Sequence, residues 1–145
     1  IVGEVDMIQS IDSERLARAV SEAALKTERG YVDVLVEVNI GDESSKSGVA
    51  QENLEELLHT VSAFDGIRVR GLMAIPPILP TEAEKRAIFS QMNKLFIDIR
   101  GKNVDNITME ILSMGMSNDY VEAIREGSTL VRIGSAIFGA RDYNK

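Results

Sequence analysis

The sequence contains no cysteine, no tryptophan and only one histidine, His59. Without cysteine the chain can form neither a disulfide nor a cysteine-ligated zinc site, and it has no thiol nucleophile. A single histidine argues against a histidine-based metal site and against a recognisable Ser-His-Asp triad. His59 stands between Leu58 and Thr60 in a helical pattern, which favours a surface or half-buried helix residue over a catalytic one. The absence of cysteine is compatible with the reducing cytoplasm, where we expect this protein.

The chain also lacks a long apolar run and an excess of positive charge. No apolar segment approaches the roughly 20 residues that cross a bilayer. The net charge of −7 at pH 7 provides no positive surface for nucleic acid or for an anionic membrane. The 145 residues, 44% hydrophobic and 27% charged, have the composition of one ordinary globular domain. Ile1–Ser10 has no signal-peptide pattern and soon reads as a strand, so we expect the sequence to start within a fold.

A regular alternation of strand and helix patterns is present instead. Tyr31–Ile40 is rich in β-branched residues and is interrupted only by Asp33, Glu37 and Asn39. Such a run is typical of a parallel strand that is covered on both faces. Strands are expected at Val5–Gln9, Tyr31–Ile40, Ile67–Ile75, Met109–Met114 and Thr129–Ile133.

Segments with helical periodicity lie between these strands. Asp12 is the expected N-cap of a helix that continues to about Glu28. Thr81 and Glu84 have the spacing of a capping box and open a helix that ends near Gly101. Two further helices are indicated by Leu54, Leu57, Leu58 and Val61 and, after Asn118, by Tyr120, Val121 and Ile124.

This alternation predicts an α/β fold with right-handed crossovers and a parallel sheet. Five strands are too few to close a barrel of eight. As a complete protein the chain would form an open doubly wound sheet, and as a fragment it would form five-eighths of a parallel (β/α)8 TIM-type barrel. We find no linker, so residues 1–145 are expected to form a single domain.

Two of the strand patterns end in the same way, with a glycine close to a hydroxyl residue: Gly115-Met116-Ser117 and Gly134-Ser135. Backbone N–H groups and the positive end of a helix dipole suit an anion at such a turn. Two such turns on neighbouring strands match the phosphate site that follows the last two strands of a (β/α)8 barrel. Taken alone, Ser117 is as readily interpreted as an ordinary helix N-cap.

Other candidates lie at or near the ends of strands. Arg132 interrupts an apolar strand, where a cation needs a partner, either a phosphate or a buried carboxylate such as Glu110 or Glu37. Strand alternation turns Arg132 away from Val131 and Ile133, so that it can point into a barrel interior. Two further strand-end residues, Asn39 and Met73, either line a ligand cavity or, for Met73, belong to the core.

The polar loop Gly41–Gly48 is expected to be solvated. Asp42 and Glu43 are more typical of such a loop than of a metal site, so we assign no metal. Lys46 is too exposed in this pattern to be an activated amine.

Five segments carry a specific resemblance: QSIDSERLA, VLVEVNIGDESSKSGV, VRGLMAIPP, LSMGMSNDYVEAIREGSTLVRIG and SAIFGARDY. In this order they span nearly the whole chain, which resembles the pyridoxal phosphate homeostasis protein family of the YggS/PROSC type. These proteins are single-domain relatives of the alanine racemase N-terminal barrel. The resemblance implies a (β/α)8 barrel that binds pyridoxal 5′-phosphate (PLP) without established racemase activity. Its implied role is to hold and deliver the cofactor and to balance vitamin B6 and amino-acid pools.

The resemblance also implies site residues. The phosphate cradle of the family falls on Ser117, with Gly115 in the same MGMS motif, and on Gly134 and Ser135 in RIGS. Arg132 corresponds to the arginine that faces the cofactor, at either its phosphate or its ring nitrogen. The remaining pocket residues implied are Met73 and Asn39.

The chain departs from the family in one respect. The family's Schiff-base lysine lies on the first strand, upstream of anything here, and two further upstream βα units are missing as well. None of the lysines of this chain stands at the end of a strand in the matching place. These lysines are Lys26, Lys46, Lys85, Lys94, Lys102 and Lys145. Residues 1–145 thus correspond to about the last five βα units of the barrel, with the phosphate half of the site and without its covalent half.

Three functional hypotheses follow. The first is a non-catalytic PLP-binding homeostasis protein, whose partners would be PLP and PLP-dependent apo-enzymes. The second is an amino-acid racemase of the alanine racemase type. The third is a fragment with little cofactor affinity, which would self-associate through sheet edges exposed at Val5–Gln9 and Leu130–Ile133.

Overall fold

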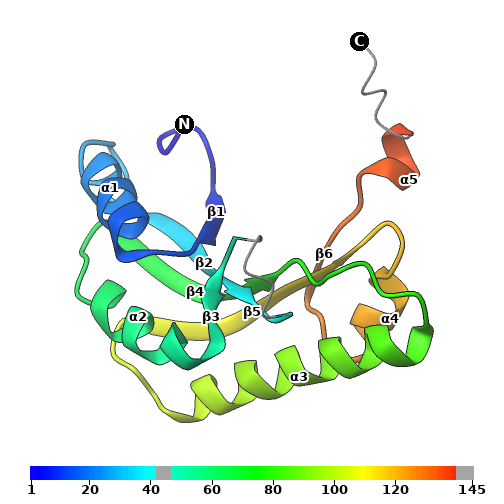
Figure 1. Ribbon diagram of the computed structural model, residues 1–145. Coiled ribbons are helices and arrows are strands. Elements are labelled where there is room, and N and C mark those ends of the chain that lie inside the picture. The colour runs from blue at the N-terminus through cyan, green and yellow to red at the C-terminus, as the bar shows by residue number, and fades with distance from the viewer. Residues whose placement is uncertain (42–46, 140–145) are drawn as a thin grey trace.

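The computed structural model describes residues 1–41 and 47–139, in which a curled, all-parallel sheet carries helices around its outside (Figure 1). The expected residues Asp42, Glu43, Lys46 and Lys145 lie outside the described part of the chain. The main strands follow the order β1-β2-β4-β5-β6, and the two-residue strand β3 pairs in parallel with β2. Their bounds are β1 Met7–Ile11, β2 Val32–Asn39, β3 Val49–Ala50, β4 Ile67–Ala74, β5 Ile107–Met116 and β6 Leu130–Arg132. The predicted parallel α/β architecture is confirmed.

Most of the helices cover the convex side of this sheet, whereas the last short helix, Ser135–Phe138, stands apart from it (Figure 1). The capping box that was expected at α3 is present, because the Glu84 N–H donates to Thr81 Oγ1 at 3.2 Å and the Thr81 N–H donates to the Glu84 carboxylate at 3.1 Å. None of the described helices is long and apolar enough to cross a membrane. Their bounds are α1 Glu14–Ala24, the 3₁₀ turn η1 Gln51–Asn53, α2 Leu54–Val61, α3 Glu82–Gly101, α4 Tyr120–Arg125 and α5 Ser135–Phe138.

Helix α1 differs from the prediction at both ends. Its N-cap is Ser13, whose side chain accepts a hydrogen bond from the Leu16 N–H, so Asp12 was the wrong choice by one residue. Helix α1 ends at Ala24 rather than near Glu28, because the Thr27 hydroxyl donates to the Ala24 carbonyl at 2.7 Å and leads the chain into a turn. A side chain that binds the free backbone groups of the terminal turn decides where a helix stops.

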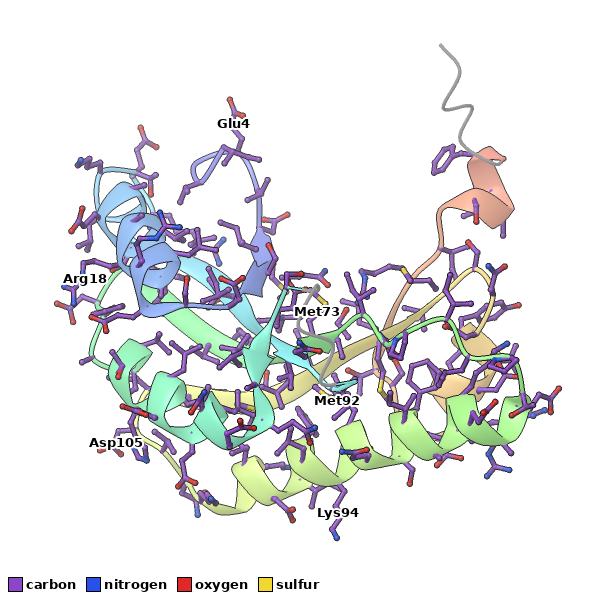
Figure 2. All side chains as sticks on the ribbon, in the orientation of Figure 1. Glu4, Arg18, Met73, Met92, Lys94 and Asp105 are labelled. Atoms are coloured by element: carbon purple, nitrogen blue, oxygen red, sulfur yellow. The ribbon has the colours of Figure 1, made fainter. Side chains whose placement is uncertain are left out.

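The sheet has two faces with different chemistry. Alternate residues such as Val34, Val36 and Leu72 pack against the helices in one apolar core, together with Met92 of α3. The other face, which we call the concave face, carries Asp33, Leu35 and Glu37 of β2, Met73 of β4 and Ser113 of β5. Figure 2 shows Met73 on the concave side and Met92 on the side of the helices.

A hydrogen bond across the concave face shows that the sheet is strongly curled. The Ser113 hydroxyl on β5 donates to Gln9 Oε1 on β1 at 2.8 Å, although β2 and β4 lie between these strands. In a flat sheet three strand spacings would separate β1 and β5 by roughly 14 Å. The sheet must therefore bend inward like the wall of a barrel. Strands β1 and β6 are its edges within the described residues, so an incomplete barrel was the right prediction.

The N-terminal half of the concave face is held by ion pairs. Arg70 of β4 donates to Asp33 Oδ2 at 3.1 Å and also to the Glu110 carboxylate of β5. Glu110 was one of the two carboxylates proposed to pair with Arg132, and this proposal was wrong, because Glu110 lies too near the start of β5 and pairs with Arg70. These two ion pairs link β2, β4 and β5, the three central strands, below the site described next.

Replacing Arg70 by methionine is expected to lower the free energy of unfolding by about 1–2 kcal/mol, because Asp33 would keep a mostly buried charge without this cation. The matched control is Lys102→Met, which removes an exposed ion pair with Glu55 and should cost less than about 0.5 kcal/mol. Urea unfolding followed by circular dichroism measures both. Equal losses in the two variants would contradict the account.

Candidate functional site

The ends of β5 and β6 meet at the C-terminal edge of the sheet. The Ser117 hydroxyl oxygen, just after β5, accepts hydrogen bonds from the Gly134 N–H at 3.3 Å and from the Ala136 N–H at 3.1 Å. The two glycine–hydroxyl turns expected from the sequence are thus brought into direct contact. The alternative of Ser117 as the N-cap of α4 is wrong, because Asp119 occupies that position and its carboxylate accepts the Met116 N–H at 2.6 Å.

This contact leaves hydrogen-bond donors directed to solvent. Gly134 and Ser135 are exposed at the start of the short helix α5. The Ala136 N–H is used by Ser117, whereas the Ser135 N–H and the Ser135 and Ser117 hydroxyl protons have no acceptor among the described residues. Such a set of N–H and O–H donors is what an acceptor-only anion such as a phosphate requires.

The two glycines of these turns have different structural roles. Gly115 has a φ of +92°, and a Cβ placed there would lie 2.5 Å from the Ala123 Cβ. Its missing side chain therefore lets α4 pack closely on β5. A Cβ at Gly134 would meet nothing within 4 Å, so the fold does not need a glycine there. The open space in front of Gly134 is available to a ligand.

Arg132 points onto the concave face, as strand alternation predicted. Its Nη1 donates to Ser113 Oγ at 2.6 Å and its Nη2 donates to the Ala74 carbonyl at 3.0 Å. Burial lowers the pKa of Arg132, and the negative charges of Glu37 and Asp119 act in the opposite direction. Neither Glu110 nor Glu37, the two carboxylates expected as partners, makes a hydrogen bond with Arg132. A hydroxyl and a carbonyl do so instead, while Glu37 acts only through its charge.

A row of side chains lies directly below the strand ends. Glu37, Met73 and Ser113 occupy paired register positions on β2, β4 and β5. Glu37 is buried and accepts a hydrogen bond from the Ser47 hydroxyl at 2.6 Å. Met73 is buried beside Ser113, whereas Asn39 is half-buried at the end of β2. Met73 thus lies next to the serine that binds Arg132, and Asn39 lies farther along β2 on the same side.

Sequence patterns missed Ser113 as a contributor to this site, and they placed Gln9 and Ala74 only within strand-end regions, Gln9–Asp12 and Met73–Pro77, without singling either residue out. Ser113 offered a weak signal, because it is a small polar residue inside the apolar segment Met109–Met114. Gln9 offered a similar signal within a short strand. Ala74 contributes only its backbone carbonyl, which no side-chain pattern can reveal.

The lysines of the described part of the chain belong to the helical layer and not to the strands of the sheet. None of them follows a strand. Lys85 and Lys94 belong to α3, and Lys26 and Lys102 lie in the turns after α1 and α3. Lys85 of α3 donates at 3.3 Å to the carbonyl of Asn118, the residue that follows Ser117. His59 is exposed on α2, as expected. Among the described residues no group of three or more histidine, aspartate or glutamate side chains is placed to hold a metal ion.

The different roles of Gly115 and Gly134 are testable by one substitution at each. Gly115→Ala is expected to lower the free energy of unfolding by roughly 1–3 kcal/mol, because the new methyl group overlaps Ala123. Gly134→Ala should change it by less than about 0.5 kcal/mol. Urea denaturation of both variants measures the difference. A Gly134→Ala variant as unstable as Gly115→Ala would show that our account of the open space is wrong.

Comparison with known proteins supports the same fold. The family model described as alanine racemase, N-terminal domain, matches residues 2–142. The pyridoxal phosphate homeostasis protein of Aquifex aeolicus is 40% identical over 143 residues, which are 99% of this chain and 61% of that protein. The chain therefore spans less than two thirds of the length of this curated relative.

Solved structures show the fold directly. The structure of PipY from Synechococcus elongatus with PLP bound matches with a TM-score of 0.82 at 31% identity, covering 95% of this chain and 63% of that one. Alanine racemase from Corynebacterium glutamicum matches with a TM-score of 0.61 at 17% identity, over 95% of this chain and 36% of that one, which shows a shared fold alone. The family match over residues 2–142 and the curled parallel sheet lead to one conclusion: the chain belongs to the family of the alanine racemase N-terminal domain.

Proposed function

We propose that this chain carries the phosphate-binding side of a PLP site and that its role is to hold the cofactor. The observation that carries the proposal is the contact of the Ser117 hydroxyl with the N–H groups of Gly134 and Ala136. This contact joins two strand ends into one cradle and leaves Ser135 and the Ser117 hydroxyl proton directed outward. The bound PLP of the PipY structure and the name of the Aquifex aeolicus relative support the choice of ligand.

The residues present fit a phosphorylated pyridine. Ser117, Gly134 and Ser135 would bind the phosphate through hydroxyl and backbone donors. Arg132 would face the same ligand from the concave side, with Met73 against the ring and Asn39 at the rim of the pocket. We assign Gly115 the indirect role of setting the turn that presents Ser117.

PLP supplies a reactive aldehyde and an electron-withdrawing ring when it is bound. The described residues bring neither a lysine nor a histidine to the concave face, and no reaction step is assigned to them. We therefore propose cofactor holding rather than conversion, with delivery to PLP-dependent apo-enzymes in the cytoplasm. Racemisation of amino acids is the second candidate, because the matching family model is described as alanine racemase, N-terminal domain.

A titration with three vitamin B6 compounds tests the proposal. Pyridoxamine 5′-phosphate has the phosphate and the ring but no aldehyde, so it cannot condense with surface lysines. Pyridoxal has the aldehyde and the ring but no phosphate. We expect PLP and pyridoxamine 5′-phosphate to shift the amide NMR signals of Ser117, Gly134 and Ser135, and pyridoxal to leave them unchanged.

The same titration, repeated with a Gly134→Ala variant, provides the control, and the pattern of shifted signals can refute the phosphate cradle. Gly134→Ala should weaken pyridoxamine 5′-phosphate binding by about tenfold, because the added methyl group occupies the open space at the cradle. Shifts confined to the lysines Lys26, Lys85, Lys94 and Lys102, or equal shifts with pyridoxal, would refute a phosphate cradle. Racemisation of alanine in the presence of PLP would favour the second candidate.

A further inference from the structure

Ser113 is a fully buried serine that connects both edge strands of the sheet. It has no solvent-exposed surface, and it lies on β5 in the middle of the concave face. Its hydroxyl accepts a hydrogen bond from Arg132 Nη1 of β6 at 2.6 Å and donates one to Gln9 Oε1 of β1 at 2.8 Å. Strands β1 and β6 are the two ends of the sheet order, so this pair of bonds reaches from one edge to the other.

The direction of these hydrogen bonds follows from chemistry. A guanidinium has N–H donors and no acceptor, so Ser113 must accept from Arg132. The single hydroxyl proton of Ser113 is then free to donate, and the acceptor it meets is the amide oxygen of Gln9. Arg132 therefore sets the orientation of the Ser113 hydroxyl, and Gln9 prevents that hydroxyl from turning away. A charged donor makes the first of these bonds a strong one.

The arrangement leaves most of the guanidinium free for a ligand. Nη1 and Nη2 each use one N–H, on Ser113 and on the Ala74 carbonyl. A guanidinium has five N–H donors, so three of them make no hydrogen bond with a described residue. Because two bonds on two different nitrogens fix a planar group, the directions of the remaining three are fixed as well.

We propose that Ser113 and Gln9 are positioning residues, which hold the Arg132 guanidinium in one orientation with its free N–H groups directed toward an acceptor atom of the bound cofactor. This inference rests on the proposed function for the identity of the ligand, and it deepens that function by assigning two residues that do not touch the ligand. Without this arrangement, Arg132 would have to be ordered when the ligand binds, and that ordering would weaken binding.

The first test uses the ligand-free protein. Hindered rotation about the Cζ–Nη bonds gives separate NMR signals for the Nη protons of Arg132, which Arg132→Lys identifies by their loss. We expect these signals to be resolved in the starting protein and averaged in Ser113→Ala and in Gln9→Leu. Gln9→Glu keeps an acceptor oxygen and should restore the resolved signals. Resolved signals in Ser113→Ala and in Gln9→Leu would overturn the proposal.

The second test measures binding of pyridoxamine 5′-phosphate. Ser113→Ala should weaken it by about tenfold in the starting protein and by less than about twofold in the Arg132→Lys background, because the two residues act as one unit. Ser21→Ala is the matched control: Ser21 is also a buried serine, and its hydroxyl accepts the Gly66 N–H at 3.0 Å far from this face. Ser21→Ala should alter stability without changing the affinity or the Arg132 signals.

The two tests separate failure of the inference from failure of the proposed function. If the starting protein shows no binding of pyridoxamine 5′-phosphate, the proposed function fails, while the Nη signals still decide whether Ser113 and Gln9 orient Arg132. Equal losses of affinity for Ser113→Ala in both backgrounds would show a merely structural serine and would overturn the inference.

Discussion

The guanidinium of Arg132 is the charge on which the arrangement of the concave face depends. A cation removed from water needs hydrogen-bond acceptors, and this one finds them on two other strands, at Ser113 of β5 and at the carbonyl of Ala74 on β4. Gln9 on β1 then completes the hydrogen bonding of Ser113. Four of the parallel strands meet around one side chain only because the sheet is curled, so the barrel-like curvature and the polar centre of the site require each other.

Polar groups on this face are separated along the strands according to their roles. Near the strand starts, Arg70 pairs with Asp33 and Glu110 and links the central strands. Near the strand ends, Arg132 keeps donors free and Ser117 joins two turns. In barrels of this type the N-terminal ends of the strands serve stability and the C-terminal ends carry function. Each arginine is thus matched to its surroundings: Arg70 is paired with carboxylates, whereas Arg132 has neutral hydrogen-bond partners and can still receive an anion or another acceptor.

The sequence predicted what depends on local chemistry. Periodicity located the five main strands, and the Thr81–Glu84 spacing located a capping box. The paired glycine–hydroxyl turns at Ser117 and Ser135 were expected on neighbouring strands, and they do lie in contact. One error was local and concerned the exact start of a helix. Ser13 rather than Asp12 caps α1, because a single residue of register decides which oxygen reaches the free N–H groups.

Long-range pairing was beyond the reach of sequence patterns. Glu110 and Glu37 are equally plausible partners for Arg132 in the sequence, and only the register of β5 against β4 assigns Glu110 to Arg70. The two-residue strand β3 is too short to show a period. The bond between Ser113 and Gln9 joins residues 104 positions apart, and it depends on a curvature that no local pattern encodes.

The central claim is that the ends of β5 and β6 form one phosphate cradle, and a crystal structure of this chain with pyridoxamine 5′-phosphate tests it most directly. The account predicts the phosphate within hydrogen-bond distance of the Ser135 N–H and the Ser117 hydroxyl, with the ring on the side of Arg132. A phosphate bound elsewhere on the protein, with Ser117 and Ser135 facing only water, would contradict it.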